Sequence, residues 1–207
     1  MRVDGVRTTH LLYLHGFRSS PQSAKARQVA EWVRANRPDL EWWCPQLPPS
    51  PRQAVDMLLD RLKGWPVDTM AVIGSSLGGF YACHIAERIG CRAVLLNPAV
   101  NPSADLSKHI GETTAWHSDE RFYFRPEFID ELRQLTPTAL SRPERYFAVI
   151  AKGDEVLDWR AMTALCTGCK IKLLEGSDHG LSDFSDHLPD VIELLGLAPR
   201  GYQVTSV

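Results

Sequence analysis

A serine flanked by glycines at positions two before and two after it lies near the middle of the chain. The segment Gly74-Ser75-Ser76-Leu77-Gly78 fits the pattern G-x-S-x-G, between a buried apolar run and a helical stretch. At a sharp strand-to-helix turn the glycines Gly74 and Gly78 are needed, because larger side chains would collide with the neighbouring strand or helix. The bare pattern is common by chance, but this context favours Ser76 as a nucleophile over an ordinary Gly/Ser turn.

Two downstream loops contain the partners that such a serine requires. A serine hydroxyl is a poor nucleophile without a base, and the base needs an orienting acid. With a nucleophile in this kind of turn, the acid and then the histidine follow it along the chain. Asp154 follows the apolar run Tyr146–Ala151, and His179 follows Ile171–Leu174. Because parallel strands end at one edge of a sheet, we predict Asp154 as the acid and His179 as the base.

Several other acids and histidines compete for these two roles. Glu155 and Asp158 lie in the same loop as Asp154 but deeper in the segment, and Asp158 is placed to cap the following helix. Among the other histidines, His187 lies inside the last predicted helix, and His109 and His117 precede the acid in the chain. Asp178 and Asp183 suit loop or capping positions.

Two backbone N–H groups are predicted to stabilise a developing oxyanion. The first belongs to Leu77, at the start of the helix that follows the serine. The second should come from the loop after the first apolar run, Leu11–Leu14, where Gly16 lets the backbone turn toward the nucleophile. We assign this second donor to the N–H of Phe17 and interpret His15 as a structural residue of the same loop.

The elements that must position these groups alternate between apolar runs and amphipathic stretches. The alternation is typical of one α/β domain spanning residues 1–207, with a mostly parallel sheet of about six strands and helices on both faces. The predicted strands are Leu11–Leu14, Glu41–Cys44, Val67–Ile73, Ala93–Leu96, Tyr146–Ala151 and Ile171–Leu174. The predicted helices are Ala24–Arg34, a helix after the capping box Ser50-Pro51-Arg52-Gln53, Leu77 to about Ile89, Trp159–Leu165, and Ser185 to Leu195.

A long segment, roughly Asn101 to Pro143, interrupts this alternation. It is too long for a structureless loop inside a compact domain, so we predict a small cap-like insertion with a helix opening at Pro126. Its aromatic residues suit either the small core of such a cap or an apolar wall for an acyl group, and both readings are kept: Trp116, Phe122, Tyr123, Phe124 and Phe128. The tail from about residue 198 to 207 is predicted to be loose.

Composition excludes several classes of partner. The chain has 207 residues, 44% of them hydrophobic, and its 23 Lys and Arg against 25 Asp and Glu give a net charge of −2. Without basic runs or a long apolar stretch, we expect no nucleic-acid partner and no membrane span. No signal peptide is visible at the N-terminus, which favours the cytoplasm.

The five cysteines do not form a disulfide framework or a metal site by their spacing. Their odd number and wide separation favour reduced thiols. Only Cys166-Thr167-Gly168-Cys169 has metal-like spacing, and no second Cys or His pair completes a tetrahedral site. We therefore predict no metal ion.

Blocks along the whole chain resemble the small YqiA-type esterases of the α/β-hydrolase superfamily. These blocks are Leu12-Tyr13-Leu14-His15-Gly16-Phe17, Pro45-Gln46-Leu47-Pro48-Pro49, Gly74-Ser75-Ser76-Leu77-Gly78-Gly79, Asn97-Pro98-Ala99-Val100 and Gly153-Asp154-Glu155-Val156-Leu157-Asp158. The resemblance implies a carboxylic-ester hydrolase without a metal or organic cofactor, and acyl thioesters are a further substrate class. It carries over Ser76, Asp154 and His179 as the catalytic triad.

Three other functions stay open at this point. An acyltransferase would use the same triad with a second alcohol or thiol as acceptor, and a thioesterase differs only in the leaving group. A non-catalytic binding protein on the same fold is disfavoured because all three triad positions carry the required residue types. The main expectation is a serine esterase acting on a small, neutral or weakly charged acyl ester.

Overall fold

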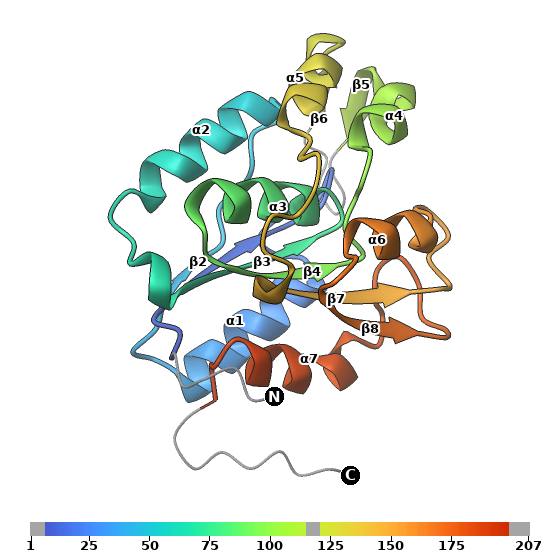
Figure 1. The fold of residues 1–207 in the computed structure, drawn as a ribbon. Helices are drawn as coiled ribbons and strands as arrows, with labels where there is room; N and C mark the ends of the chain where they lie inside the picture. The colour runs from blue at the N-terminus through green and yellow to red at the C-terminus, as the bar shows by residue number, and fades with distance from the viewer. Residues whose placement is uncertain (1–6, 115–120, 199–207) are drawn as a thin grey trace.

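Six parallel strands form the main sheet of the computed structural model, which describes residues 7–114 and 121–198. The strand order is β2-β1-β3-β4-β7-β8, and every neighbouring pair is parallel (Figure 1). The strands are β1 (His10–Leu14), β2 (Glu41–Trp43), β3 (Met70–Ser75), β4 (Arg92–Leu96), β7 (Tyr146–Ala151) and β8 (Lys170–Leu174). The predicted α/β class is confirmed.

Helices cover both faces of this sheet. One face packs against α1 (Ala24–Asn36) and α7 (Phe184–Leu194), and the other against α2 (Pro51–Leu62), α3 (Leu77–Ile89) and α6 (Trp159–Leu165) (Figure 1). Successive residues of a strand point to opposite faces, so a strand in the middle of such a sheet is apolar along its whole length. This burial on both sides explains why the strands are visible in the sequence as continuous apolar runs.

One predicted strand begins later than expected. Residues Val67–Thr69 form a short 3-10 helix, and β3 starts only at Met70. The N–H groups of Thr69 and Met70 both donate to the carbonyl of Pro66, which commits these residues to a tight turn. The prediction of a strand from Val67 was therefore wrong by three residues, whereas its apolar centre was placed correctly.

The N-terminus of α2 is capped, but only half of the predicted capping box forms. The Ser50 hydroxyl accepts the N–H of Gln53 at 3.2 Å, as expected. Within the described residues, the Gln53 side chain does not complete the box, and a carboxylate from another helix takes its place. Glu131 accepts a hydrogen bond from the Ser50 hydroxyl at 2.8 Å and from the Arg52 N–H at 3.0 Å. The cap therefore ties α2 to a helix eighty residues further along the chain.

Loss of this cap should be measurable as a stability change. Ser50→Ala is expected to lower the free energy of unfolding by about 1–2 kcal/mol, because the Gln53 N–H and the Glu131 carboxylate lose their shared partner. Urea unfolding followed by circular dichroism measures the change. Ser107→Ala, at an exposed serine that bonds only within its own turn, is the matched control. Equal unfolding midpoints for the two variants would contradict the expectation.

Residues 101–114 and 121–135 fold into helices and a small hairpin at the top of the view in Figure 1, and the chain then descends toward β7. The elements of this segment are α4 (Pro102–Leu106), a 3-10 turn (Ser107–His109), the antiparallel strands β5 (Gly111–Thr114) and β6 (Arg121–Phe124), α5 (Glu127–Leu135), and a 3-10 turn (Pro143–Arg145). The helix expected from Pro126 is confirmed, whereas the hairpin was not predicted.

The aromatic residues of this segment divide between two environments. Phe124 and Phe128 are buried with their rings 5.5 Å apart, which makes them part of the core. Phe122 instead lines a cavity, and Tyr123 is exposed. Trp116 lies outside the described residues, as do His117 and nearly all of the tail from residue 198.

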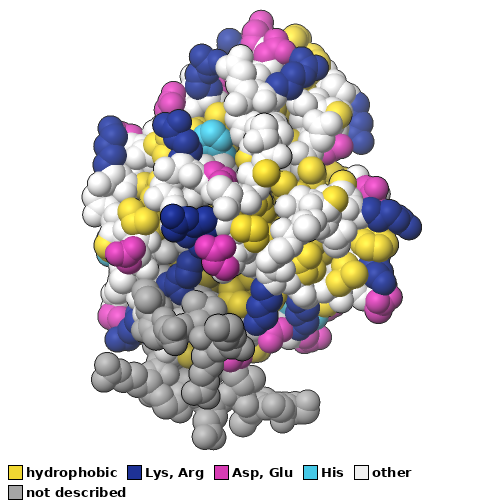
Figure 2. Space-filling view, viewed as in Figure 1, with side chains coloured by type: hydrophobic (Ala, Val, Ile, Leu, Met, Phe, Trp, Pro, Cys, Tyr) yellow, Lys and Arg dark blue, Asp and Glu magenta, His cyan; other side chains and the backbone are white. Residues whose placement is uncertain are grey.

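The described residues contain neither a helix suited to cross a membrane nor a cluster of metal-binding side chains. Within residues 7–114 and 121–198, none of the helices combines the length and apolar character needed to cross a bilayer. The same residues contain no group of three or more His, Cys, Asp or Glu side chains arranged for a metal ion. All five cysteines are free. On the face shown in Figure 2, charges of both signs are interspersed, without a continuous basic patch.

Candidate active site

Ser76 lies in a strained turn between β3 and α3. Its φ of 56° and ψ of −121° are unfavourable for a residue with a side chain, at a cost of about 1–3 kcal/mol. Two of its backbone hydrogen bonds tie the turn to the end of β4 and the residues after it: the Ser76 N–H donates to the Leu96 carbonyl at 3.0 Å, and the Ser76 carbonyl accepts the Ala99 N–H at 3.0 Å. The surrounding chain therefore forces the serine into a conformation it would not adopt alone.

The glycines around Ser76 stand where other residues have no space. A Cβ at Gly78 would overlap the carbonyl oxygen of Leu14 and lie 2.7 Å from that of His15. A Cβ at Gly74 would overlap the Gly78 carbonyl, on the other side of the turn. The backbone of α3 can approach the end of β1 this closely only because these side chains are absent.

This close approach makes a strong prediction for Gly78. Gly78→Ala is expected to lower the free energy of unfolding by about 3 kcal/mol or more, because backbone atoms rather than a flexible side chain must move. Gly64→Ala is the control, since a Cβ there would meet nothing within 4 Å. Chemical denaturation of both variants measures the difference. A Gly78→Ala protein as stable as Gly64→Ala would contradict the expectation.

The structure brings Ser76, His179 and Asp154 into one hydrogen-bonded row. His179 Nε2 lies 3.0 Å from the Ser76 Oγ, and His179 Nδ1 lies 2.8 Å from the Asp154 Oδ2. The Asp154 side chain is fully buried, and its Oδ1 accepts the N–H groups of Val156 and Leu157, both at 2.8 Å. Both carboxylate oxygens are thus engaged, which fixes the orientation of the acid toward the imidazole.

The competing residues occupy other positions. Asp158 caps α6 by accepting the Arg160 N–H at 2.9 Å, as the sequence predicted. Glu155 does not reach the imidazole but accepts the backbone N–H of His179 at 3.0 Å. The others bond within their own segments or contact a neighbouring ring: His187 with Asp183, Asp178 with Ser182, and His109 with Phe17. His117 lies outside the described residues.

Asn97 is a residue of this site to which the sequence assigned no role. It is fully buried directly after β4, with a φ of 42°. Its Nδ2 donates to the carbonyls of Asp178 at 3.0 Å and His179 at 3.2 Å, and its Oδ1 accepts the Ala151 N–H at 2.8 Å. One carboxamide thereby joins the end of β7, which leads to Asp154, to the loop that carries His179. The clue in the sequence was a polar residue directly after the apolar run Ala93–Leu96.

The two predicted oxyanion donors lie beside the serine with free N–H groups. Among the described residues, neither the Phe17 N–H nor the Leu77 N–H donates a hydrogen bond. Leu77 is the first residue of α3. A Cβ at Gly16 would lie 3.3 Å from the Ser76 Cβ, so the loop that carries Phe17 runs against the nucleophile.

His15 supports this loop as a neutral, structural side chain. It is almost fully buried, and burial lowers its pKa. Its Nε2 accepts the Leu47 N–H at 3.1 Å, and its Nδ1 lies 3.0 Å from the Gly16 carbonyl. A neutral ring that is protonated on Nδ1 satisfies both contacts. His15 thus joins the loop after β1 to the segment 45–49.

Two cavities meet at Ser76 and His179. One, of about 180 Å³, extends toward the mainly apolar residues of α4 and the loop after β7. The other, of about 360 Å³, extends toward the start of α1, where burial lowers the pKa of Lys25 to about 8 and its ammonium donates to the Gly180 carbonyl. The serine and the imidazole therefore face open space on two sides.

Comparison with solved structures shows the fold class. The chain is similar to mouse alpha/beta hydrolase domain-containing protein 10 (16% identity, TM-score 0.67, 92% of each chain covered). It is similar to Est1E from Butyrivibrio proteoclasticus with ferulic acid bound (15% identity, TM-score 0.67, 94% of this chain and 90% of that chain). The esterase domain of a Rhodothermus marinus protein also matches (19% identity, TM-score 0.62, 95% and 88%).

These likenesses confirm the predicted α/β-hydrolase fold. A family model described as "Uncharacterised protein family (UPF0227)" matches residues 10–196, nearly all of the described chain. The match agrees with the YqiA-type resemblance of the sequence, and the chain belongs to this family.

Proposed function

We propose that the protein is a serine hydrolase that cleaves small carboxylic esters, with Ser76 as nucleophile, His179 as base and Asp154 as orienting acid. The observation that carries the proposal is the continuous hydrogen-bonded row of these three side chains, with the serine held in a strained turn. The esterases and hydrolases of the same fold support the hydrolase class.

In the proposed mechanism the Ser76 Oγ attacks the ester carbonyl carbon while His179 Nε2 takes the hydroxyl proton. Asp154 stabilises the resulting imidazolium through its bond to Nδ1. The N–H groups of Phe17 and Leu77 bind the oxyanion of the tetrahedral intermediate. When the intermediate collapses, the C–O bond to the alcohol breaks and the alcohol oxygen takes the proton from His179. Water then attacks the acyl-enzyme with the same imidazole as base, which releases the acid and restores Ser76.

Product analysis separates hydrolysis from the two related activities. We expect the protein to convert methyl acetate to acetate and methanol, and to do so at the same rate when a second alcohol is added in excess. If the acyl group were instead transferred to the added alcohol, the protein would be an acyltransferase. The matched methyl thioester tests the leaving group. Turnover of the thioester alone would overturn the assignment to carboxylic esters.

A further inference from the structure

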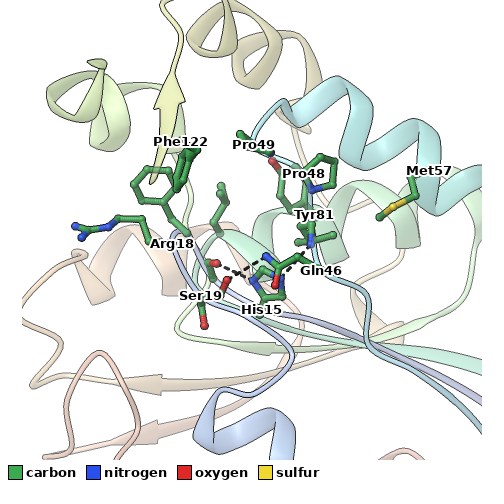
Figure 3. A pocket seen from close by; sticks show the side chains of 13 residues that line it. His15, Arg18, Ser19, Gln46, Pro48, Pro49, Met57, Tyr81 and Phe122 are labelled. Carbon is green, nitrogen blue, oxygen red and sulfur yellow. Dashed lines mark hydrogen bonds between the residues drawn. The ribbon is translucent and has the colours of Figure 1, made fainter. Parts of the chain in front are cut away.

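A third cavity, of about 340 Å³, lies beside the oxyanion donors and has no part in the mechanism above. It is bounded by Phe17 and Leu77 on the side of the active site. Figure 3 shows Pro48 and Pro49 of the segment 45–49, Met57 of α2, Tyr81 of α3 and Phe122 of β6 around it. The volume falls within the range of cavities that bind small organic molecules.

The walls of this cavity carry no ionised group that faces into it. No Asp, Glu or Lys lines it. The Arg18 side chain extends away from it (Figure 3), and its guanidinium donates to the Thr114 carbonyl. His15, at the base, is kept neutral by burial, which lowers its pKa. A charged ligand group would lose its hydration here without gaining a partner, so the cavity suits an uncharged group.

Ring-shaped side chains make the cavity suitable for an aromatic ligand. The Phe17 and Phe122 rings are 6.1 Å apart and nearly perpendicular, so they present both an edge and a face. The Tyr81 ring lies opposite, with the Met57 thioether near it (Figure 3). Thioethers and aromatic edges both make favourable contacts with a bound ring.

A buried polar group of the cavity, the Tyr81 hydroxyl, is available to a ligand. The Tyr81 side chain is only 2% exposed, yet its hydroxyl makes no hydrogen bond to any described residue. Burial raises the pKa of Tyr81, so the hydroxyl keeps its proton and can donate. Gln46 lies near it, with Nε2 donating to the Ser19 carbonyl at 3.3 Å. A polar substituent on the ligand would complete the hydrogen bonding of Tyr81.

The position of His179 decides which half of an ester enters this cavity. The alcohol leaves with a proton from His179 Nε2, so it must occupy a space that the imidazole lines. His179 and Ser76 both line the cavities of 180 and 360 Å³, and neither side chain lines this one, so a group that enters it must reach past the oxyanion position. This cavity shares Phe17 and Leu77 with the oxyanion position. The acyl part, which stays bonded to Ser76, is therefore the part that can extend past these two residues.

From this geometry we infer that the third cavity binds the acyl group of the substrate, and that this group is an uncharged aromatic ring with a hydroxyl or similar polar substituent at its far end. The inference rests on the proposed function and specifies its substrate class. The substrate is thus an ester of a hydroxyaryl-alkanoic acid, and Tyr81 is a specificity-determining residue.

A series of methyl esters tests this assignment because the leaving group stays constant. The series consists of acetate, hexanoate, 3-phenylpropanoate and 3-(4-hydroxyphenyl)propanoate, with acid release measured by chromatography. We expect kcat/KM for the two aryl esters to exceed that for hexanoate by about tenfold or more, and the hydroxyaryl ester to be the better of the two. Equal values for aryl and alkyl esters would overturn the inference while the acetate activity still supported the proposed function.

Two variants with a matched control locate the effect. Met57→Trp fills the cavity and is expected to lower kcat/KM for the aryl esters by about tenfold or more, with methyl acetate changed by less than about twofold. Tyr81→Phe should remove only the advantage of the hydroxyaryl ester over the phenyl ester. Asp56→Trp, at an exposed position of α2, should change neither. An unaltered aryl preference in Met57→Trp would overturn the inference, and a wild-type protein that cleaves no ester would overturn the proposed function with it.

Discussion

Replacement of Ser76 by alanine is expected to lower kcat for ester hydrolysis by about 10⁴-fold or more, because no other group can form the acyl-enzyme. The loss should be in kcat rather than in KM, since the cavities beside the site keep their shape. Removal of the hydroxyl should leave stability nearly unchanged, because the side chain caps nothing and its only described hydrogen bond is to His179. Steady-state kinetics on methyl acetate, with circular dichroism as a check of folding, measures both quantities.

The control for this variant is a serine remote from the site. Ser185→Ala, on the exposed surface of α7, should keep wild-type kinetics. A purified Ser76→Ala protein that retained normal turnover would show that another residue attacks the ester, and the assignment of the nucleophile would be wrong.

Asn97→Ala is expected to have the second largest effect, on stability and activity together. The variant leaves the buried Ala151 N–H and the partly buried His179 carbonyl without their partner, and the Asp178 carbonyl keeps only the Leu181 N–H. At about 1–3 kcal/mol for each of the two unpaired groups, the free energy of unfolding should fall by at least about 2 kcal/mol. The left-handed backbone at this position adds to the cost, because alanine tolerates it less well than asparagine.

Activity separates a positioning role of Asn97 from a merely structural one. Without the Asn97 carboxamide between the loops after β7 and β8, the distance between Asp154 and His179 should vary. A folded variant should therefore show a lower kcat and a shifted acidic limb in its pH profile of kcat/KM. Asn97→Asp provides a second variant of equal shape whose carboxylate cannot donate to the two carbonyls. Asn36→Ala, at the end of α1, is the matched control. Wild-type kcat and pH profile in folded Asn97→Ala would rule out the positioning role.

The parts of the fold that were predictable from the sequence are those decided by local patterns. The run Tyr146–Ala151 forms β7 with the bounds expected, because a strand covered on both faces must be apolar throughout. The helix after Ser50 was visible from its cap, and the turn at Ser76 from its glycines. In each case the residue types within a few positions determine the local structure.

The parts that were not predictable depend on contacts between distant segments. Asn97 meets Asp178 across 81 positions of sequence, and Ser50 meets Glu131 across the same separation. No local pattern marks either pair. The hairpin of β5 and β6 was missed because β5 (Gly111–Thr114) contains no apolar run, and its partner β6 is recognised only from the pairing itself. The position of Phe122 on a cavity wall, rather than in the core with Phe124, likewise depends on how that hairpin packs against Phe17.

Covalent labelling by a fluorophosphonate tests the role of Ser76 most directly, because such a reagent requires an activated serine and phosphonylates it. Mass spectrometry of the labelled, proteolysed protein is expected to find one adduct, on the peptide that contains Ser76, and His179→Ala should abolish it by removing the base. An unlabelled wild-type protein, or an adduct on any other residue, would contradict the assignment of Ser76, His179 and Asp154 as a catalytic triad.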